Sequence, residues 1–248
     1  MTATRKADGT LERSFGRETV STAERRERIK QVFGAVAPRY DLMNDIMSFG
    51  IHRLWKRTLA RHVAAVRGFV VDLAGGTGDV ARLLAAEGRC VVVCDPSLPM
   101  MHAGMRRGRD GLVWLAGEAE RIPLGDASVD LLTVAFGLRN ATQLERALIE
   151  IRRVLKPGGR FVCLEFSRPA AWLAPLYDAY SFLVIPRLGA LVAQEPRAYQ
   201  YLVESIRRFP DQQGFSVLMQ QAGFDEARWE NVSFGIACLH SGIRPHET

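Results

Sequence analysis

A glycine-rich segment flanked by carboxylates is the part of this sequence best suited to bind a ligand. Residues 72–79 have the sequence DLAGGTGD and follow a short apolar run that is typical of a buried strand. Glycines at the end of a strand let backbone amides and the next helix N-terminus approach a ligand closely. Residues 76–81 also satisfy the GxGxxG/A pattern of dinucleotide sites. The glycines therefore predict a nucleotide-type cofactor without deciding which one.

Three acidic positions favour S-adenosylmethionine over a nicotinamide dinucleotide. Asp72 stands inside the strand, where a carboxylate can bind the ammonium group of a methionine moiety and would repel a pyrophosphate. Asp95 ends the second strand, from which a carboxylate binds the ribose hydroxyls of either cofactor. Glu118 follows the third strand, where its side chain and the amide of Ala119 could bind the adenine edge. We therefore predict an S-adenosylmethionine site.

The elements that position these residues alternate from Gly68 onward. Short β-branched runs and helical stretches follow one another, which predicts a parallel sheet with crossover helices. Strands are expected at residues 69–72, 90–94, 112–115, 129–135 and 160–166, and helices at residues 79–86, 100–107 and 144–155. Two last strands, at 227–232 and 235–239, would form a hairpin and add an antiparallel strand. The predicted fold class is α/β, with a seven-stranded, mostly parallel sheet.

Length and composition predict a single domain. A chain of 248 residues with 48% hydrophobic content can bury a sizeable core as one α/β unit. Residues 1–20 are polar and are predicted to be disordered, while residues 21–248 form the domain. An N-terminal helical lid is expected at residues 21–66 and an apolar helical insertion at 169–209. Prolines interrupt the insertion, so we do not expect it to span a membrane.

Charge and cysteine usage exclude several classes of function. The net charge of +6 comes from scattered arginines rather than a basic block, so no nucleic-acid partner is expected. The four cysteines lack the spacing of zinc ligands, so no metal is expected. The N-terminus lacks the apolar core of a secretory signal, and we expect a cytoplasmic protein.

Two longer motifs carry a family resemblance. The first is Tyr40-Asp41-Leu42-Met43-Asn44 with Ser48, His52 and Trp55 following, and the second is residues 153–159 (RVLKPGG) closing on 164–167 (LEFS). Residues 136–140 (FGLRN), 177–187 (YDAYSFLVIPR) and 210–212 (PDQ) are similar to the same family. From about residue 32 to 245 the chain resembles the ubiquinone/menaquinone biosynthesis C-methyltransferases.

The resemblance implies a class I, Rossmann-like fold and a methyl transfer to a ring carbon of a polyprenylated benzoquinol or demethylmenaquinol. By position it adds Thr77 and Ala135 to the cofactor site. Ala135 stands where the bacterial family commonly has serine, a loss of about 0.5 to 1.5 kcal/mol of hydrogen bonding. Glu118 stands where asparagine or aspartate is more usual. The predicted cofactor-binding residues are Asp72, Gly76, Thr77, Gly78, Asp95, Glu118, Ala119 and Ala135.

Carbon methylation of a quinol proceeds best from its phenolate, so the site must favour loss of a phenol proton. Arg139 follows the fourth strand, and its guanidinium could stabilise the phenolate or orient a water that takes the proton. His52 and Asp41 are the candidate proton acceptors in the lid. Equally, His52 could be a hydrogen-bonded helix residue and Asp41 a helix N-cap. The predicted catalytic residues are therefore Arg139, His52 and Asp41.

The acceptor site is predicted to combine lid residues with the apolar insertion. Its expected residues are Tyr40, Asn44, Trp55, Asn140, Tyr177 and Tyr180, although core packing is slightly favoured for the last two tyrosines. An apolar segment flanked by Arg168 and Arg187 suits a polyprenyl tail or a membrane surface. It could instead cap the sheet or form a homodimer contact.

Other functions remain compatible with parts of the sequence. The fold tolerates many acceptors, so another small aromatic acceptor is one alternative. A non-catalytic S-adenosylmethionine-binding component of a quinone-biosynthesis complex is a second, and a nicotinamide oxidoreductase is a third. The two long motifs and Arg139 favour the quinol methyltransferase.

Overall fold

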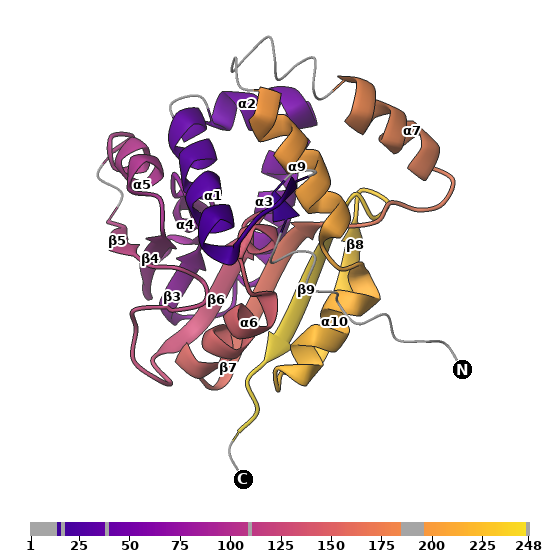
Figure 1. Ribbon diagram of the computed structural model, residues 1–248. Helices are drawn as coiled ribbons and strands as arrows, with labels where there is room; N and C mark the ends of the chain where they lie inside the picture. The colour runs from indigo at the N-terminus through magenta and orange to yellow at the C-terminus, as the bar shows by residue number, and fades with distance from the viewer. Residues whose placement is uncertain (1–13, 16–17, 38–39, 109–110, 185–195, 247–248) are drawn as a thin grey trace.

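A seven-stranded sheet forms the centre of the molecule in the computed structural model, which describes residues 14–15, 18–37, 40–108, 111–184 and 196–246 (Figure 1). The strand order is β5-β4-β3-β6-β7-β9-β8. The strands are β3 (Gly68–Leu73), β4 (Arg89–Asp95), β5 (Val113–Ala116), β6 (Val129–Ala135), β7 (Leu155–Phe166), β8 (Asp225–Val232) and β9 (Ala237–Ile243). The pairs among β3 to β7 are parallel, and β9 is antiparallel to both β7 and β8. The predicted α/β class and mostly parallel sheet are confirmed.

The predicted terminal hairpin takes an unexpected place in this sheet. β9 follows β8 in the chain, yet it lies between β7 and β8 rather than at the edge. β7 is also longer than predicted, because Leu155 already pairs with Val129, and regular pairing resumes at Arg160 after an irregularity in the register. The other predicted strands match the structure to within a few residues.

Helices cover both faces of the sheet. α3 (Ile51–His62) and α4 (Asp79–Leu84) pack on one face, and α6 (Leu144–Val154) and α10 (Gln212–Gln221) pack on the other. α5 (Leu98–Met105) follows β4 near the β5 edge (Figure 1). Because both faces are buried, the central strands are almost continuously apolar. The parallel strands therefore bring the carboxyl ends of β3 to β7 to one edge, where α/β proteins bind ligands.

A second group of helices lies above this edge (Figure 1). It comprises α1 (Thr22–Val36), α2 (Tyr40–Ser48), α7 (Ala174–Ala179), the π-helical turn η3 (Tyr180–Val184) and α9 (Pro196–Arg208). Arg25 fixes α1 to the chain segment beneath it. Its side chain is 1% exposed and donates hydrogen bonds to the carbonyl oxygens of Arg139, Asn140 and Ala141. Those carbonyls belong to a short 3-10 helix, η2 (Leu138–Asn140), and the residue after it. The helical cover and the turn after β6 are therefore joined.

The terminal segment and the insertion differ in part from expectation. Within the segment predicted to be disordered, β1 (Ser14–Phe15) pairs with β2 (Glu18–Thr19), and the Phe15 ring stacks on Tyr201 at 4.9 Å. Disorder is thus wrong for these residues, because the Phe15 ring finds a partner on α9. Residues 1–13 and 16–17, and residues 185–195 of the insertion, lie outside the described chain. No helix of the described chain is long and apolar enough to cross a membrane.

Candidate functional site

The turn after β3 folds tightly around the Asp72 carboxylate. A Cβ atom at Gly75 would lie 2.8 Å from Oδ2 of Asp72, a distance too short for any residue but glycine. Gly78 has a φ of 79° as the N-cap of α4, and a Cβ there would lie 2.9 Å from the Trp114 ring. The glycines at these two positions are required by close approach and by backbone conformation.

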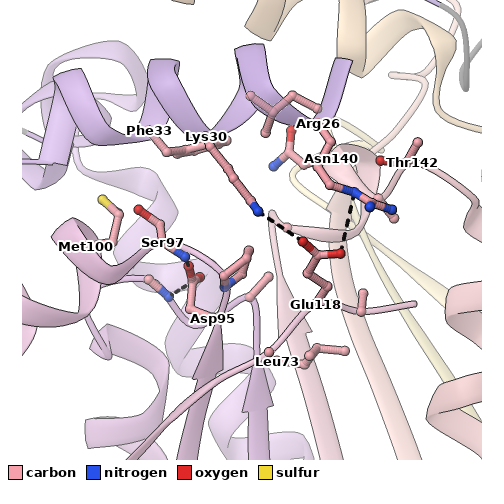
Figure 2. Close-up of a pocket in the computed structure, with 18 of the residues that line it drawn as sticks. Arg26, Lys30, Phe33, Leu73, Asp95, Ser97, Met100, Glu118, Asn140 and Thr142 are labelled. Atoms are coloured by element: carbon pink, nitrogen blue, oxygen red, sulfur yellow. Dashed lines mark hydrogen bonds and ion pairs between the residues drawn. The ribbon is translucent and has the colours of Figure 1, made fainter. Parts of the chain in front are cut away.

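Two buried carboxylates end β3 and β4. Asp72 accepts hydrogen bonds from the Ala81 amide at 3.0 Å and the Thr133 hydroxyl at 3.1 Å, and burial raises its pKa to about 7. Asp95 accepts from the amides of Gly76 at 2.8 Å and Ser97 at 2.7 Å, and burial raises its pKa to about 6 (Figure 2). Within the described chain neither carboxylate is ion-paired with a cation. Both sites therefore suit groups that donate hydrogen bonds, such as an ammonium group and ribose hydroxyls.

A cavity opens beside Asp95, and we call it the loop cavity. It has a volume of about 100 Å³ and lies between the strand ends and α1. Its lining includes Gly76, Asp95, Ser97, Met100, Glu118, Ala119, Phe136, Asn140 and Thr142 from the sheet side, and Arg26, Ile29, Lys30 and Phe33 from α1. Of the predicted cofactor residues, it contains Gly76, Asp95, Glu118 and Ala119.

The Glu118 side chain closes this cavity against α1. Its carboxylate forms ion pairs with Arg26 at 3.4 Å and Lys30 at 3.1 Å, and Figure 2 shows all three side chains converging at the cavity. The resulting volume is smaller than the roughly 300–1,000 Å³ of most ligand pockets. Glu118 and α1 therefore form the wall that limits this cavity.

Thr77 and Asp41 lie behind the glycine turn rather than in a cavity. The Thr77 hydroxyl is 3.4 Å from carboxylate oxygens of both Asp41 and Asp79 and 3.3 Å from the guanidinium of Arg107. Arg107 also pairs with Asp41 and, at 2.9 Å, with Asp79. Asp41 thus ties α2 to the cofactor turn. The lining of the loop cavity contains none of Asp41, Thr77 and Gly78, and neither does that of the second cavity described next.

A second cavity, here called the apolar cavity, has a volume of about 420 Å³. It is walled by α2, α3, α7, η3, α9 and the ends of β6 and β7. Its lining includes Asn44, Met47, Ser48, Phe49, Ile51, His52, Trp55, Lys56, Ala135, Phe136, Arg139, Phe166, Leu173, Leu176, Tyr177, Tyr180, Leu202, Ile206, Ser233 and Ile236. Four predicted acceptor residues and two predicted catalytic residues therefore meet in one place.

Three predicted positions fall elsewhere. Asn140 lines the loop cavity and accepts a hydrogen bond from the Tyr201 hydroxyl at 3.0 Å, so it does not face the apolar cavity. Ala135, assigned to the cofactor by resemblance, lines the apolar cavity instead. The side chain of Tyr40 lies outside what the structure describes.

Phe136 separates the two cavities. It lines both, and its backbone has a φ of 58°, which is strained for a bulky residue. Its ring packs against Phe166 at 4.6 Å and Trp55 at 5.9 Å between ring centroids. The Phe136 residue is therefore part of the wall of both cavities.

Arg139 is held at the apolar cavity by a buried carboxylate. Its Nη1 atom lies 3.0 Å from both oxygens of Glu165, and the guanidinium is 5.4 Å from the centroid of the Phe166 ring. Burial raises the pKa of Glu165, while the adjacent Arg139 charge acts to lower it. The Nε atom of Arg139 has no hydrogen-bond partner in the described chain, which leaves one donor for another group.

His52 is a neutral base at the opposite wall. Its Nδ1 atom is 2.7 Å from the Ser48 hydroxyl, which donates to the Asn44 carbonyl oxygen at 2.6 Å. On the other side of the ring, Nε2 lies 3.7 Å from Oδ1 of Asp45, so the two ring nitrogens face a hydroxyl and a carboxylate. Burial and the nearby Lys56 charge lower the pKa of His52 to about 4. His52 is therefore unprotonated at neutral pH.

Comparison with known proteins decides the class of chemistry. Residues 21–244 match the model of the ubiE/COQ5 methyltransferase family. The chain belongs to this family. The ubiquinone/menaquinone biosynthesis C-methyltransferase UbiE of Rubrivivax gelatinosus is 62% identical over 94% of each chain. The mitochondrial 2-methoxy-6-polyprenyl-1,4-benzoquinol methylase of Mus musculus is 41% identical, covering 94% of this chain and 84% of that protein.

Solved structures agree with the fold. An S-adenosylmethionine-dependent methyltransferase of Thermotoga maritima, described as a possible histamine N-methyltransferase, matches with a TM-score of 0.63 at 21% identity over 86% of this chain and 98% of its own. The [4+2]-cyclase SpnF matches with a TM-score of 0.64 at 15% identity, over 88% and 96%. The class I methyltransferase fold is confirmed, and the protein is an S-adenosylmethionine-dependent methyltransferase rather than a nicotinamide oxidoreductase.

The buried carboxylates of this methyltransferase fit its cofactor. Asp72 and Asp95 are buried and neither is neutralised by an ion pair within the described residues, which fits the predicted contacts with an ammonium group and with ribose hydroxyls. Burying an unpaired carboxylate is costly, so these two positions are explained by a ligand that donates to them.

Sequence reasoning missed several side chains of this methyltransferase site. Glu165 appeared only as part of a motif, although a carboxylate inside an apolar strand is itself a signal that a buried cation lies nearby. Arg26 and Lys30 carry no local signal, because they meet Glu118 only after α1 docks. Lys56 was also missed, although it follows Trp55 directly in the first motif.

Proposed function

We propose that this methyltransferase transfers a methyl group from S-adenosylmethionine to a ring carbon of a polyprenylated benzoquinol or of demethylmenaquinol, in ubiquinone or menaquinone biosynthesis. The observation that carries the proposal is the apolar cavity of about 420 Å³ that shares the Phe136 ring with the loop cavity. Its walls are mostly hydrophobic and aromatic, as a quinol with an isoprenoid tail requires. The names of the relatives support the same acceptor class.

The residues of the apolar cavity suit a phenolate reaction. The cofactor supplies an electrophilic methyl group, and the acceptor carbon becomes nucleophilic when the neighbouring phenol loses its proton. Arg139 stabilises that oxygen through a guanidinium donor, and Glu165 keeps the guanidinium oriented. His52 is unprotonated and accepts the proton, directly or through a water. The methylated ring carbon then loses its proton to water, which regenerates the phenolate, and the phenolate takes back the proton from His52 to give the methylated quinol, with release of S-adenosylhomocysteine and one proton.

The test is a methyl-transfer assay with both classes of acceptor. Purified protein, S-adenosylmethionine with a labelled methyl group and a chemically reduced, short-chain acceptor of each class are incubated, and the products are identified by mass spectrometry. We expect the label on a ring carbon of at least one quinol and no product from the oxidised quinones. A label on oxygen, or turnover of neither quinol by protein that binds the cofactor, would refute the proposal.

The mouth of the apolar cavity is also where we propose that the tail meets a membrane. Phe49 and Leu176 line the cavity yet are 75% and 70% exposed, and Trp172 packs edge-on against the exposed Phe234 at 5.3 Å. Exposed aromatic and aliphatic side chains of this kind insert into the membrane interface. The protein would then work in the cytoplasm with peripheral membrane contact.

Vesicle flotation tests this contact. We expect the wild-type protein to float with anionic vesicles and the double variant Phe49→Ser, Leu176→Ser to remain in solution. The matched control is Leu83→Ser, which removes an exposed leucine from α4, away from the cavity mouth. Equal flotation of both variants would exclude this surface, and light scattering would show whether it joins two copies of the chain instead.

A further inference from the structure

Lys56 is a buried cation at the boundary between the two halves of the site. It lies on α3 next to Trp55, and its side chain is only 10% exposed. It lines the apolar cavity, where most neighbours are hydrophobic. A buried ammonium needs anionic partners, because its transfer out of water is unfavourable. A neutral, hydrophobic acceptor in this cavity would not supply an anionic partner for the Lys56 ammonium.

The ammonium is incompletely paired by the protein. In the described chain its one hydrogen bond is to Oδ2 of Asp79, at 3.4 Å, near the upper limit for such a bond. Asp79 is shared, since Arg107 binds its other oxygen at 2.9 Å. An ammonium group has three donors, so two of them are available to another acceptor.

The charge of Lys56 acts on the cofactor side of the boundary. Burial raises the pKa of Asp72 and of Asp41, and the Lys56 charge acts against that rise, while for Asp79 the Lys56 charge contributes to a lowered pKa. The field of the ammonium thus reaches the carboxylate that suits the methionine ammonium, although the two side chains come from α3 and β3. The contact of Lys56 with Asp79, the first residue of α4 after the glycine turn, also places the Lys56 ammonium beside that turn.

The methionine moiety carries an ammonium and a carboxylate on the same carbon, so the group that binds the carboxylate lies close to the group that binds the ammonium, and a cation suits that role. Other cations of this region are engaged by the protein. Arg82 donates to the carbonyl oxygens of Thr77 and Gly104, and Arg139 pairs with Glu165. Lys56 combines burial, a place beside the boundary and unused donors.

We propose that Lys56 binds the α-carboxylate of the methionine moiety, opposite the ammonium site at Asp72. This assignment concerns the cofactor and does not depend on which acceptor is methylated. It also explains why a charged residue lines an otherwise apolar wall. Because S-adenosylhomocysteine keeps the same carboxylate, Lys56 binds cofactor and product alike.

Binding of three ligands by calorimetry separates this role from a structural one. S-adenosylhomocysteine has both charged groups, decarboxylated S-adenosylmethionine has only the ammonium, and 5′-methylthioadenosine has neither. For Lys56→Gln we expect S-adenosylhomocysteine to bind about 10- to 100-fold more weakly, the usual size of a lost charged hydrogen bond. Binding of the other two ligands should change less than about twofold, within the scatter of independent sites.

Two further variants complete the experiment. Lys56→Arg keeps the charge and should retain S-adenosylhomocysteine binding to within about fivefold, since the cation survives with altered geometry. Arg57→Gln removes an exposed charge from the next position of α3 and should leave all three affinities unchanged. Thermal unfolding without ligand checks each fold, and Lys56→Met replaces Lys56→Gln if the latter does not fold.

Each outcome of the calorimetry either supports or overturns the assignment of Lys56 to the carboxylate. A loss confined to S-adenosylhomocysteine supports carboxylate binding by Lys56. An equal loss for all three ligands would overturn the assignment and leave Lys56 as a partner of Asp79 that shapes the turn. Unchanged binding of S-adenosylhomocysteine would overturn it as well, because the carboxylate must then lie against a different group.

Discussion

The two cavities that meet at Phe136 are built in opposite ways. The loop cavity and the carboxylates beside it depend on strand ends and backbone amides, as at Asp95, which is held by the amides of Gly76 and Ser97. The apolar cavity depends on side chains from helices, and its wall draws on α2, α3, α7 and α9. The contrast is between a cofactor site whose carboxylates are held by backbone amides and an acceptor site whose wall is made of side chains from several helices.

The largest expected effect is a fall in the rate of the chemical step without a change in cofactor binding. Arg139→Ala should lower kcat about 10²- to 10³-fold, as removal of one oxyanion donor commonly does. The Kd of S-adenosylhomocysteine should stay within about threefold, because Arg139 lies on the acceptor side. Steady-state kinetics and calorimetry measure the two quantities.

A control is needed because Arg139→Ala leaves Glu165 buried without its cation. Removing one partner of a buried pair costs about 3–5 kcal/mol of stability. The double variant Arg139→Gln, Glu165→Gln leaves no unpaired carboxylate at position 165. It should show the same fall in kcat with a smaller loss of stability. Wild-type turnover in the double variant would remove Arg139 from the mechanism.

On the cofactor side, Asp72→Asn should weaken S-adenosylhomocysteine binding about 10- to 100-fold through loss of one charged hydrogen bond. Binding of 5′-methylthioadenosine, which lacks the amino-acid group, should be nearly unchanged. Calorimetry with the two ligands provides the measurement. Comparable losses for both ligands would mean that the substitution disturbs the glycine turn rather than one contact.

The same carboxylate should make the stability of the ligand-free protein depend on pH. Burial raises the pKa of Asp72 from 3.8 to about 7, so the folded state favours the protonated form. Its contribution to the free energy of unfolding is therefore fully present below pH 3.8 and is lost as the pH rises through about 7, a change of a few kcal/mol at most. Urea unfolding at several pH values should show this decline in wild type and less of it in Asp72→Asn.

A smaller effect is expected in the wall of the apolar cavity. The Trp55 indole donates a hydrogen bond to the Ser233 hydroxyl at 2.8 Å and packs beside Phe136. Trp55→Phe should raise the KM of the quinol about two- to tenfold, the size of one neutral hydrogen bond. The Kd of the cofactor should not change. If the cofactor Kd changed more than the quinol KM, the separation into two halves would be wrong.

The smallest effect concerns the closure of α1 over the loop cavity. The double variant Arg26→Gln, Lys30→Gln removes both ion pairs of Glu118, each half-exposed and together contributing about 1 kcal/mol. Release of S-adenosylhomocysteine should become about two- to fivefold faster in stopped-flow experiments. High salt should speed release from the wild type and have less effect on the variant. Slower release would show that these side chains do not hold the cover closed.

The cofactor half was more predictable because its signals are local. Strand periodicity placed Asp72 and Asp95, and consecutive glycines marked the turn between strand and helix. The sheet order was not local, and the position of β9 inside the sheet depends on pairing with β7, about 80 residues earlier in the chain. The family resemblance supplied what periodicity could not, namely the acceptor class.

In the acceptor half, the sequence did not predict which cavity each side chain faces. Arg139 and Asn140 are adjacent, and both were expected to face the reaction. In the 3-10 helix η2 their side chains diverge, so Arg139 lines the apolar cavity and Asn140 the loop cavity. Asp41 and His52 belong to one motif, yet only His52 reaches the apolar cavity, because Arg107 draws Asp41 toward the glycine turn.

The place of β9 in the sheet has a consequence for synthesis of the chain. The strands that hold the cofactor carboxylates are made early and pair with one another, so this half can begin to fold while the ribosome is still translating. β8 has no partner in the described sheet except β9, which is made after it and must enter between β7 and β8. Ser233 and Ile236 in the preceding turn reach the apolar cavity only after that step. The nascent protein therefore acquires its acceptor site later than its cofactor site.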